Sequence, residues 1–463
     1  MAKSIDKTEL FARTPVPKAL RTMAIPTIVS QLINLVYNVV DTFFIGRTGN
    51  SFMVAATTIA FTLVMMMTAL SNLFGIGGGS HVARLMGAGH SEKAKSVSSF
   101  CLYASILMAL AYSALIGLFL EPLLKFFGAS DQTLGFAKSY TVIVIVIGAL
   151  PGILSLVLAH LLRNTGYSGK ASIGLSGGGL LNVALDPLFM FVIMPKGQEV
   201  TGAALATLIS NICACAYLLA AYARASRKSP LSINPADARQ ADRENIRKVI
   251  SVGVPSAILP GLFDVANICL NILAAGHSDL VLAAMGIVMK AERIPNAINI
   301  GICQGMLPIV AFNLTSGDHA RMKETLDTAR RAGLTIAFTC IVLFELLAGR
   351  ISGVFLSTTG GNAESAVRTL AYAALFLRIR CLASPVQFMN YYSSFSLQAL
   401  GDGRRTMILS IVRELVIYIP FMFILNIPFG EIGLAASLPA GEACSAVFAF
   451  WLLSRALKER RTS

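Results

Sequence analysis

The stretch QLINLVYNVVD, residues 31–41, lies inside an apolar run that extends from Met23 to Gly46. Its four polar positions are spaced by three, four and three residues, and they are Gln31, Asn34, Asn38 and Asp41. On an α-helix this spacing places the side chains along one stripe. The run is long enough to span a bilayer, where a carboxylate is costly unless it faces a protein interior or a watery cavity. The stretch therefore predicts a membrane helix whose polar stripe lines a cavity of the bundle to which it belongs.

Apolar runs of similar length recur along the whole chain of 463 residues, which is 55% hydrophobic and only 13% charged. A soluble domain is nearer a quarter charged. Twelve runs are long enough to cross a membrane, and they cover residues 23–46, 52–77, 97–120, 139–162, 171–195, 202–223, 249–275, 280–312, 332–349, 369–397, 406–426 and 432–454. We therefore expect an all-α integral membrane protein with twelve transmembrane helices.

The basic residues are distributed unevenly between alternate loops. Most of the 38 lysines and arginines fall in the two tails and in the loops on the same side as the tails. The opposite loops contain only Arg47, Lys125, Lys138, Lys196, Arg350 and Arg368. This asymmetry predicts that both termini are cytoplasmic. We expect the membrane to be a prokaryotic plasma (inner) membrane. The asymmetry also explains the net charge of +14 through contact with anionic lipid, without a nucleic-acid partner.

The polar stretch 224–248 divides the chain, and short motifs on its two sides resemble each other in the same order. The matched pairs are Pro26 with Pro255, Asn38 with Asn267, Gly77 with Gly305, Gly166 with Gly401, and Gly202 with Gly433. We expect two six-helix bundles, residues 1–223 and 249–463, joined by the cytoplasmic linker 224–248. Because each half has an even number of spans, a pseudo-two-fold axis along the membrane normal should relate them.

A second carboxylate lies in the fifth span, where Asn182 and Asp186 share a helix face and Pro187 follows. We expect Asp186 and Asp41 to share an amide-lined pocket in the first bundle, since no Lys or Arg lies in these spans to neutralise them. Tyr37 lies one turn before Asp41. Two close carboxylates favour uptake of a proton, and their oxygen atoms together with amide and hydroxyl oxygens also suit sodium. Proton and sodium both remain open as the coupling ion.

The second half carries a different set of acidic residues. Asp264 begins a polar stripe with Asn267 and Asn271, which we expect to line the cleft and to suit a cationic substrate, while Leu270 occupies the repeat position of Asp41. Glu292 is predicted to pair with a neighbour on its own span, either Lys290 or Arg293. Glu345, Glu414 and Glu442 are predicted to be structural or solvated. The eight cysteines lie inside predicted spans, at no metal-ligand spacing.

These features together resemble the multidrug and toxic compound extrusion (MATE) family over almost the whole chain. The resemblance rests on the duplicated layout and on IPTIVSQLINLVYNVVDTFFIGR, GIGGGSHVARLMGAGHSEKAKSVSSF, LLRNTGYSGK, LLNVALDPLF, GAALATLIS and GMLPIVAFNL. The DinF-like branch is the most similar. It implies a cation site formed by Tyr37, Asp41, Asn182, Asp186 and Thr207, with sodium or a proton as the ion, and a helix bend at Pro26. Asp264 lies near the place where the NorM-like branch has an acidic residue.

The resemblance implies export of organic, often cationic, compounds in exchange for protons or sodium by alternating access. We expect the substrate cavity to be lined by Gln31, Asn34, Asn38, Asp264, Asn267 and Asn271. We expect a monomer that is not an enzyme and needs no cofactor or structural metal. One alternative is a flippase for lipid-linked oligosaccharides, although the first bundle has no arginine cluster for a pyrophosphate. Another is an intramembrane serine hydrolase, since GYSG at 166–169 and GLSG at 174–177 contain Ser168 and Ser176, with His160 as the nearest base.

Overall fold

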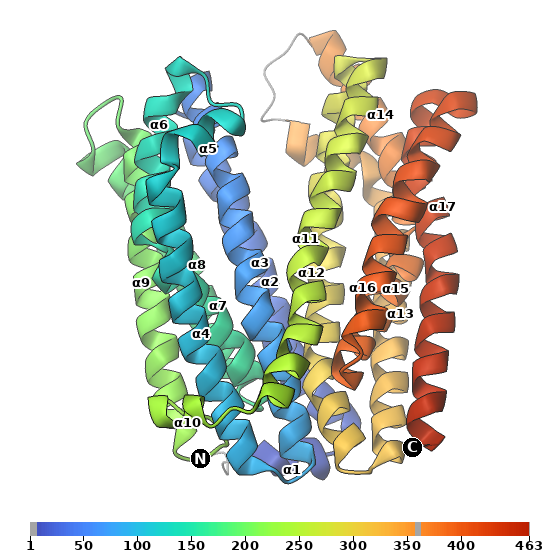
Figure 1. The fold of residues 1–463 in the computed structure, drawn as a ribbon. Helices are drawn as coiled ribbons and strands as arrows, with labels where there is room; N and C mark the ends of the chain where they lie inside the picture. The colour runs from blue at the N-terminus through green and yellow to red at the C-terminus, as the bar shows by residue number, and fades with distance from the viewer. Residues whose placement is uncertain (1–6, 357–362, 463) are drawn as a thin grey trace.

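The computed structural model describes residues 7–356 and 363–462, and every regular element within them is helical. The helices form two bundles that stand side by side, as Figure 1 shows. Both termini lie at one end of the molecule, together with the short helices α1 and α10. We call this end the terminal face.

The first bundle follows the chain from α1 to α9. Its helices are α1 (Lys7–Ala12), α2 (Val16–Gly46), α3 (Ser51–Gly87), α4 (Ser91–Leu118), α5 (Leu120–Phe126), α6 (Asp131–Thr141), the π-helical segment η1 (Val142–Ile147), α7 (Ala149–Asn164), α8 (Ser168–Leu188), the π-helical segment η2 (Phe189–Ile193) and α9 (Glu199–Ser226). α2 is continuous across Pro26, and a bend there stays a prediction.

The second bundle follows the linker helix α10 (Pro235–Arg239). Its helices are α11 (Arg243–His277), α12 (Asp279–Thr315), α13 (His319–Leu356), α14 (Ala363–Cys381), α15 (Ser384–Leu400), α16 (Gly403–Ile411), the π-helical segment η3 (Val412–Tyr418) and α17 (Ile419–Thr462). α11 begins before the apolar run that predicted it, because Asp242 caps its first turn by accepting a hydrogen bond from the backbone N–H of Asn245 at 2.7 Å.

The described helices account for twelve membrane crossings, as predicted. Nine helical runs are long and apolar enough to span a bilayer, and one of these nine crosses twice. Two further spans are bent pairs, each with an angle of 51°. The bent pairs are α6–η1 with α7 and α14 with α15. The run Gly403–Arg460 holds the last two crossings, because Gly430 interrupts it with φ 54° and ψ −136°. Only glycine adopts that backbone conformation readily, so this residue ends one span and starts the next.

The two bundles contact each other through two closely related helix crossings. In one, α3 meets α11, and a Cβ atom on Gly77 would lie 2.8 Å from the Cα atom of Gly253. In the other, α12 meets α2, and a Cβ atom on Gly305 would lie 2.7 Å from the Cα atom of Ala24. Gly77 and Gly305 are repeat partners, so the same close packing occurs on both sides of the pseudo-two-fold axis. Small residues permit such backbone contact between membrane helices.

The terminal face is tied together by polar contacts that cross between distant parts of the chain. The linker packs on α4, where Ser99 and Tyr103 donate hydrogen bonds to the carbonyl oxygens of Asn234 and Ile233, each at 2.7 Å. Helix α1 packs on the second bundle, because Asn313 and Arg321 both donate to one carbonyl oxygen at the end of α1, that of Phe11. The bundles are therefore closed against each other at this end.

Candidate functional site

A polar cluster lies inside the first bundle, between α8 and α9. Asn182 donates one hydrogen bond to Asp186 Oδ1 at 3.1 Å and another to Thr207 Oγ1 at 3.3 Å. Asp186 is completely buried, and its two partners are nearly so. Pro187 and the wide turn of η2 follow at once, so the local backbone departs from a regular α-helix beside the carboxylate. The structure thus brings together three of the residues that the sequence singled out.

Helix α2 supplies the other two members of this cluster, which we call the first-bundle pocket. Tyr37 and Asp41 lie within electrostatic range of each other and of Asp186. Three buried acceptors in the described pocket have no hydrogen-bond donor, namely Asp41 Oδ1, Asn182 Oδ1 and Asp186 Oδ2. Buried acceptors normally have a partner. Oxygen atoms of this kind fit a proton on one carboxylate, or a hard cation such as sodium.

Tyr140 is a member of the pocket that the sequence analysis missed. It lies on α6, is 7% exposed, contacts Thr207 and is within electrostatic range of both aspartates. A lone tyrosine near the start of a span is usually an interfacial residue, so its position gave no reason to select it. The available signal was the polar triplet Ser139–Thr141 directly before the apolar run VIVIVI.

A separate cavity of about 380 Å³ lies between the two bundles, and we call it the central cavity. Gln31, Asn34 and Asn38 of α2 line it, opposite Asn267 of α11. These three amides therefore lie at a cavity between the bundles, where a substrate cavity was expected, and only the prediction that the whole stripe lines a cavity inside the first bundle is wrong for them. Asp41, about one turn further along α2, is not part of that lining and lies within electrostatic range of Asp186 on α8, so the stripe serves two sites.

Asp264 and Asn271 lie on α11 outside the lining of the central cavity, and both are exposed. Asp264 is within electrostatic range of Arg293, which does line the cavity. Leu270, the repeat partner of Asp41, is completely buried in the apolar core of the second bundle. The second bundle therefore has no carboxylate at the position that Asp41 occupies in the first.

Glu292 does not pair with Lys290 or Arg293, and that prediction is wrong. It binds Arg380 of α14 through two hydrogen bonds, from Nε at 2.7 Å and from Nη2 at 2.9 Å. Neighbours one or two positions apart on a helix point in different directions, so they do not face each other. An arginine 88 residues away in the chain supplies the partner instead.

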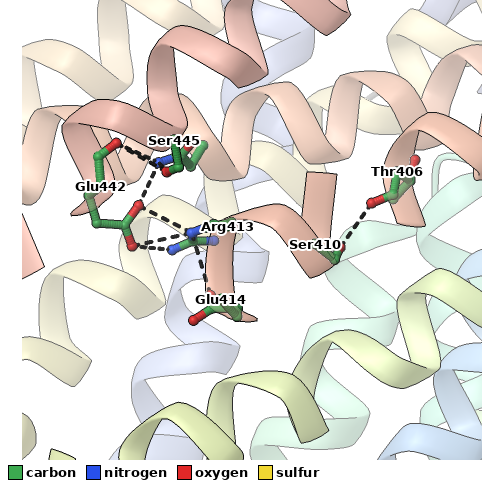
Figure 2. A network of polar contacts seen from close by, with 7 residues as sticks. Thr406, Ser410, Arg413, Glu414, Glu442 and Ser445 are labelled. Carbon is green, nitrogen blue, oxygen red and sulfur yellow. Dashed lines mark hydrogen bonds and ion pairs between the residues drawn. The ribbon is translucent and has the colours of Figure 1, made fainter. Parts of the chain in front are cut away.

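Two other glutamates of the second bundle, Glu414 and Glu442, are buried. Figure 2 shows their contacts with Arg413. Glu442 accepts hydrogen bonds from Arg413, the shortest from Nη2 at 2.6 Å, and one from Asn390 at 2.5 Å. It is structural, as predicted. Glu414 is buried, borders the central cavity and lies 3.5 Å from Arg413 Nε, so it is not solvated, and a structural role for it stays a prediction. Glu345 is partly exposed, 3.8 Å from Arg378.

The serines of the two GxSG motifs are placed differently from a hydrolase nucleophile. Ser168 donates to the carbonyl oxygen of Met23 at 2.7 Å and contacts Thr27 at 3.1 Å, so it joins α8 to α2. His160 packs against Gly75 on α3. Among the hydrogen bonds of the described residues, none joins His160 to Ser168 or to Ser176. A serine hydrolase needs such a base beside its nucleophile.

Comparison with known proteins identifies similarity over the whole chain. The family model MatE matches residues 26–188 and 255–424, one segment in each bundle. The multidrug export proteins MepA of Staphylococcus saprophyticus and Staphylococcus aureus are 28% and 27% identical over 452 residues, covering 98% of this chain and 96% of each relative.

Solved structures share the fold. A MATE crystal structure in complex with MaL6 superimposes with a TM-score of 0.92 at 21% identity and covers 99% of both chains. An outward-facing conformation of a multidrug resistance MATE family transporter gives a TM-score of 0.91, also at 21% identity, and covers 100% of both chains. Two bundles of six helices are therefore the architecture of this chain.

Proposed function

Since this chain belongs to the MatE family, we propose that it is a secondary active transporter that exports organic, often cationic, compounds in exchange for protons or sodium. The family match covers most of both bundles. Relatives that match along nearly the full chain are named multidrug export proteins. The two-bundle architecture with a cavity between the bundles suits alternating access, in which one bundle rocks against the other.

The observation that carries the coupling proposal is the first-bundle pocket. It contains two carboxylates, and among the described residues neither of them forms an ion pair with a lysine or arginine. A site of this kind changes its charge when it takes up a proton or sodium. We propose that Tyr37, Asp41, Asn182, Asp186 and Thr207 bind the coupling ion. Uptake of the ion would neutralise the pocket and favour a different packing of α2 against α8. Because the ion binds one packing better than the other, ion flow would drive the protein between the two states of alternating access.

The central cavity is the proposed substrate site. Its volume of about 380 Å³ lies within the range of small-molecule pockets. Three amides of α2 and Asn267 of α11 offer hydrogen bonds, while Leu259, Phe263 and Met289 offer apolar surface. Asn271 lies one turn beyond Asn267 and is exposed, so we assign it, with Asp264, to the outer part of the substrate route. A cavity with this mixture suits organic compounds of varied shape.

We propose that the terminal face is cytoplasmic and that the protein works as a monomer in the plasma membrane. The basic residues gather on the side of the termini, as the positive-inside rule requires. The contacts of α1, the linker and the glycine crossings hold the bundles together at that end. The structure then corresponds to a state closed to the cytoplasm. One copy contains both bundles and both sites, so no second copy is needed for exchange.

The test is transport in proteoliposomes, with a pH gradient and a sodium gradient imposed separately and ethidium as the fluorescent probe. We expect ethidium to move against the direction of one of the two ions. Liposomes without protein, and liposomes with both gradients collapsed, are the controls. Failure of both gradients to move ethidium, or any other organic compound supplied, would reject the proposal. Transfer of a fluorescent pyrophosphate lipid between leaflets would favour the flippase instead.

A further inference from the structure

Two buried arginines of the first bundle reach across to the second bundle, between the central cavity and the terminal face. Arg84 of α3 donates from Nη1 to the carbonyl oxygen of Gln398 on α15 at 3.0 Å, and to that of the next residue at 3.1 Å. Arg163 of α7 donates from Nη1 to Gln304 Oε1 on α12 at 3.1 Å. The two arginines are 8% and 4% exposed. Both acceptors follow the last cavity-lining residues of their helices, so the contacts lie on the terminal side of the cavity.

The two contacts occupy equivalent positions of the repeat. Extending the match of Gly166 with Gly401 by three residues places Arg163 on Gln398, so α7 and α15 are repeat partners. The glycine crossings make α3 and α12 repeat partners as well. One contact therefore runs from α7 to α12 and the other from α3 to α15, on the two sides of the pseudo-two-fold axis. In both, the cation belongs to the first bundle and the neutral oxygen belongs to the second.

Neither arginine forms an ion pair with a carboxylate among the described residues. Arg84 instead lies within electrostatic range of another cation, Arg460. The acceptors of Arg84 are among the last carbonyl oxygens of α15, at the negative end of the helix dipole. A Cβ atom on Gly401 would lie 3.0 Å from Arg84 Cζ, so the glycine that ends α15 leaves room for the guanidinium. Water can replace neutral acceptors of this kind at little net cost.

Each contact also contains a buried polar atom that has no hydrogen-bond partner among the described residues. The two atoms are Arg163 Nε and Gln398 Oε1. Buried polar atoms normally have a partner, and a buried arginine without a carboxylate is costly. Water would reach all of these groups if the bundles separated at the terminal face. The closed arrangement is therefore held by hydrogen bonds that opening can replace, in contrast to the ion pairs inside the second bundle.

We infer that Arg84 and Arg163 form a latch that holds the terminal face closed, and that both become hydrated when the central cavity opens towards that face. The need for an open state rests on the proposed function, whereas the place of the latch rests on the contacts. Because both cations belong to one bundle and their acceptors to the other, a single movement of the bundles breaks both contacts. The arginines are not part of the lining of the central cavity, so they act on the balance between the two states.

The experiment measures how often the latch opens in the full protein in lipid nanodiscs. Phenylglyoxal reacts with accessible guanidinium groups, and peptide mass spectrometry gives the reaction rate of each arginine. A buried arginine reacts only when its surroundings open, so its rate reports the open fraction. The exposed Arg239 of α10 is the internal reference. Thermal unfolding of each variant checks that it is folded.

Arg84→Met removes two charge-assisted hydrogen bonds from the closed state, so Arg163 should react about tenfold faster or more. Arg239 should react at an unchanged rate. The matched control is Arg405→Met, because Arg405 lies just after α15 and binds two carboxylates of its own bundle. It should leave the rate of Arg163 unchanged. An unchanged or slower reaction of Arg163 in Arg84→Met would overturn the inference, as would an equal increase in Arg405→Met.

A second variant decides the case if Arg84→Met does not fold. Gln304→Leu removes the acceptor of Arg163 and leaves that cation without its partner in the closed state. Arg84 should then react about tenfold faster, because an unpaired buried donor destabilises the state that contains it. An unchanged rate for Arg84 would contradict the inference. Failure of the proposed function is a different result, since the rates would respond to the variants while neither gradient moved ethidium.

Discussion

The two bundles share the order of their helices but treat buried charge in opposite ways. In the first bundle, Asp41 and Asp186 have amide and hydroxyl neighbours and no arginine partner among the described residues. In the second, Arg380 and Arg413 hold Glu292 and Glu442 in short ion pairs. A pocket without fixed cations can change its charge by binding an ion, whereas a paired network keeps its charge. We therefore propose that the duplicated fold separates an ion-responsive half from a rigid one.

Packing, by contrast, is repeated faithfully. Gly77 and its repeat partner Gly305 each let a helix of one bundle touch a helix of the other. Close crossings depend only on small side chains, so both copies can retain them without losing function. Under the proposed function a single ion site is sufficient for coupling, so the polar residues of the two halves need not match. The comparison of the bundles leads to four predictions, of which the first has the largest expected effect.

Replacement of Asp41 by Asn should abolish gradient-driven export while the protein still folds. The change removes the charge and keeps the size of a side chain that is not ion-paired. Asp186→Asn should fail in the same way, and the double variant should be scarcely worse, because residues that act as a unit are not additive. Proteoliposome transport and thermal unfolding measure the two properties. Full export by Asp41→Asn would show that Asp41 of the first bundle is not needed for coupling. Additive losses of export in the double variant would indicate that Asp41 and Asp186 belong to separate sites.

In the second bundle, Glu442→Gln should reduce stability far more than Asp41→Asn does. Loss of one partner leaves Arg413 buried and poorly compensated, which costs about 3–5 kcal/mol of unfolding free energy. Glu121→Gln, which removes the partner of Lys125 and Lys138 in exposed ion pairs, is the control and should have little effect. Denaturation in detergent gives the values. Equal stability of Glu442→Gln and Asp41→Asn would contradict the contrast between the bundles.

Closure of the terminal face should be sensitive to Gly253→Ala. The added Cβ atom would lie 2.1 Å from the carbonyl oxygen of Leu73, so the α3–α11 crossing must open. Overpacking of this kind costs about 1–3 kcal/mol. Distances between spin labels on the two bundles should lengthen at the terminal face. Gly286→Ala is the matched control, because a Cβ atom there meets no neighbour within 4 Å. Unchanged distances in Gly253→Ala would show that this crossing does not hold the face closed.

The smallest effect is expected for Tyr140→Phe. The change removes one hydroxyl beside Thr207 and leaves both carboxylates in place. A neutral hydrogen bond contributes about 1 kcal/mol, so the concentration of ion that gives half-maximal export should change by less than about tenfold. Transport measured over a series of proton and sodium concentrations tests this. A complete loss of coupling would mean that Tyr140 is as essential to the pocket as the aspartates.

Much of this protein was determined by local sequence. Run length and hydropathy predicted the twelve spans, since a membrane helix needs about twenty apolar residues whatever surrounds it. Motifs in the same order predicted the duplication. The spacing of Asn182 and Asp186 predicted their contact, because residues four apart on a helix face each other. These properties belong to one helix or to the order of helices.

The tertiary structure alone decided which helices supply the partners of each polar residue. Arg380 is 88 residues from Glu292, and nothing in the periodicity of either span joins them. The polar stripe of α2 is divided between two sites because α8 packs against one part of the helix, whereas another part faces the central cavity opposite α11. Tyr140 joins the first-bundle pocket only because the bent span of α6 and α7 passes beside α9. Helix rotation and packing set these contacts, and a linear pattern does not contain either of them.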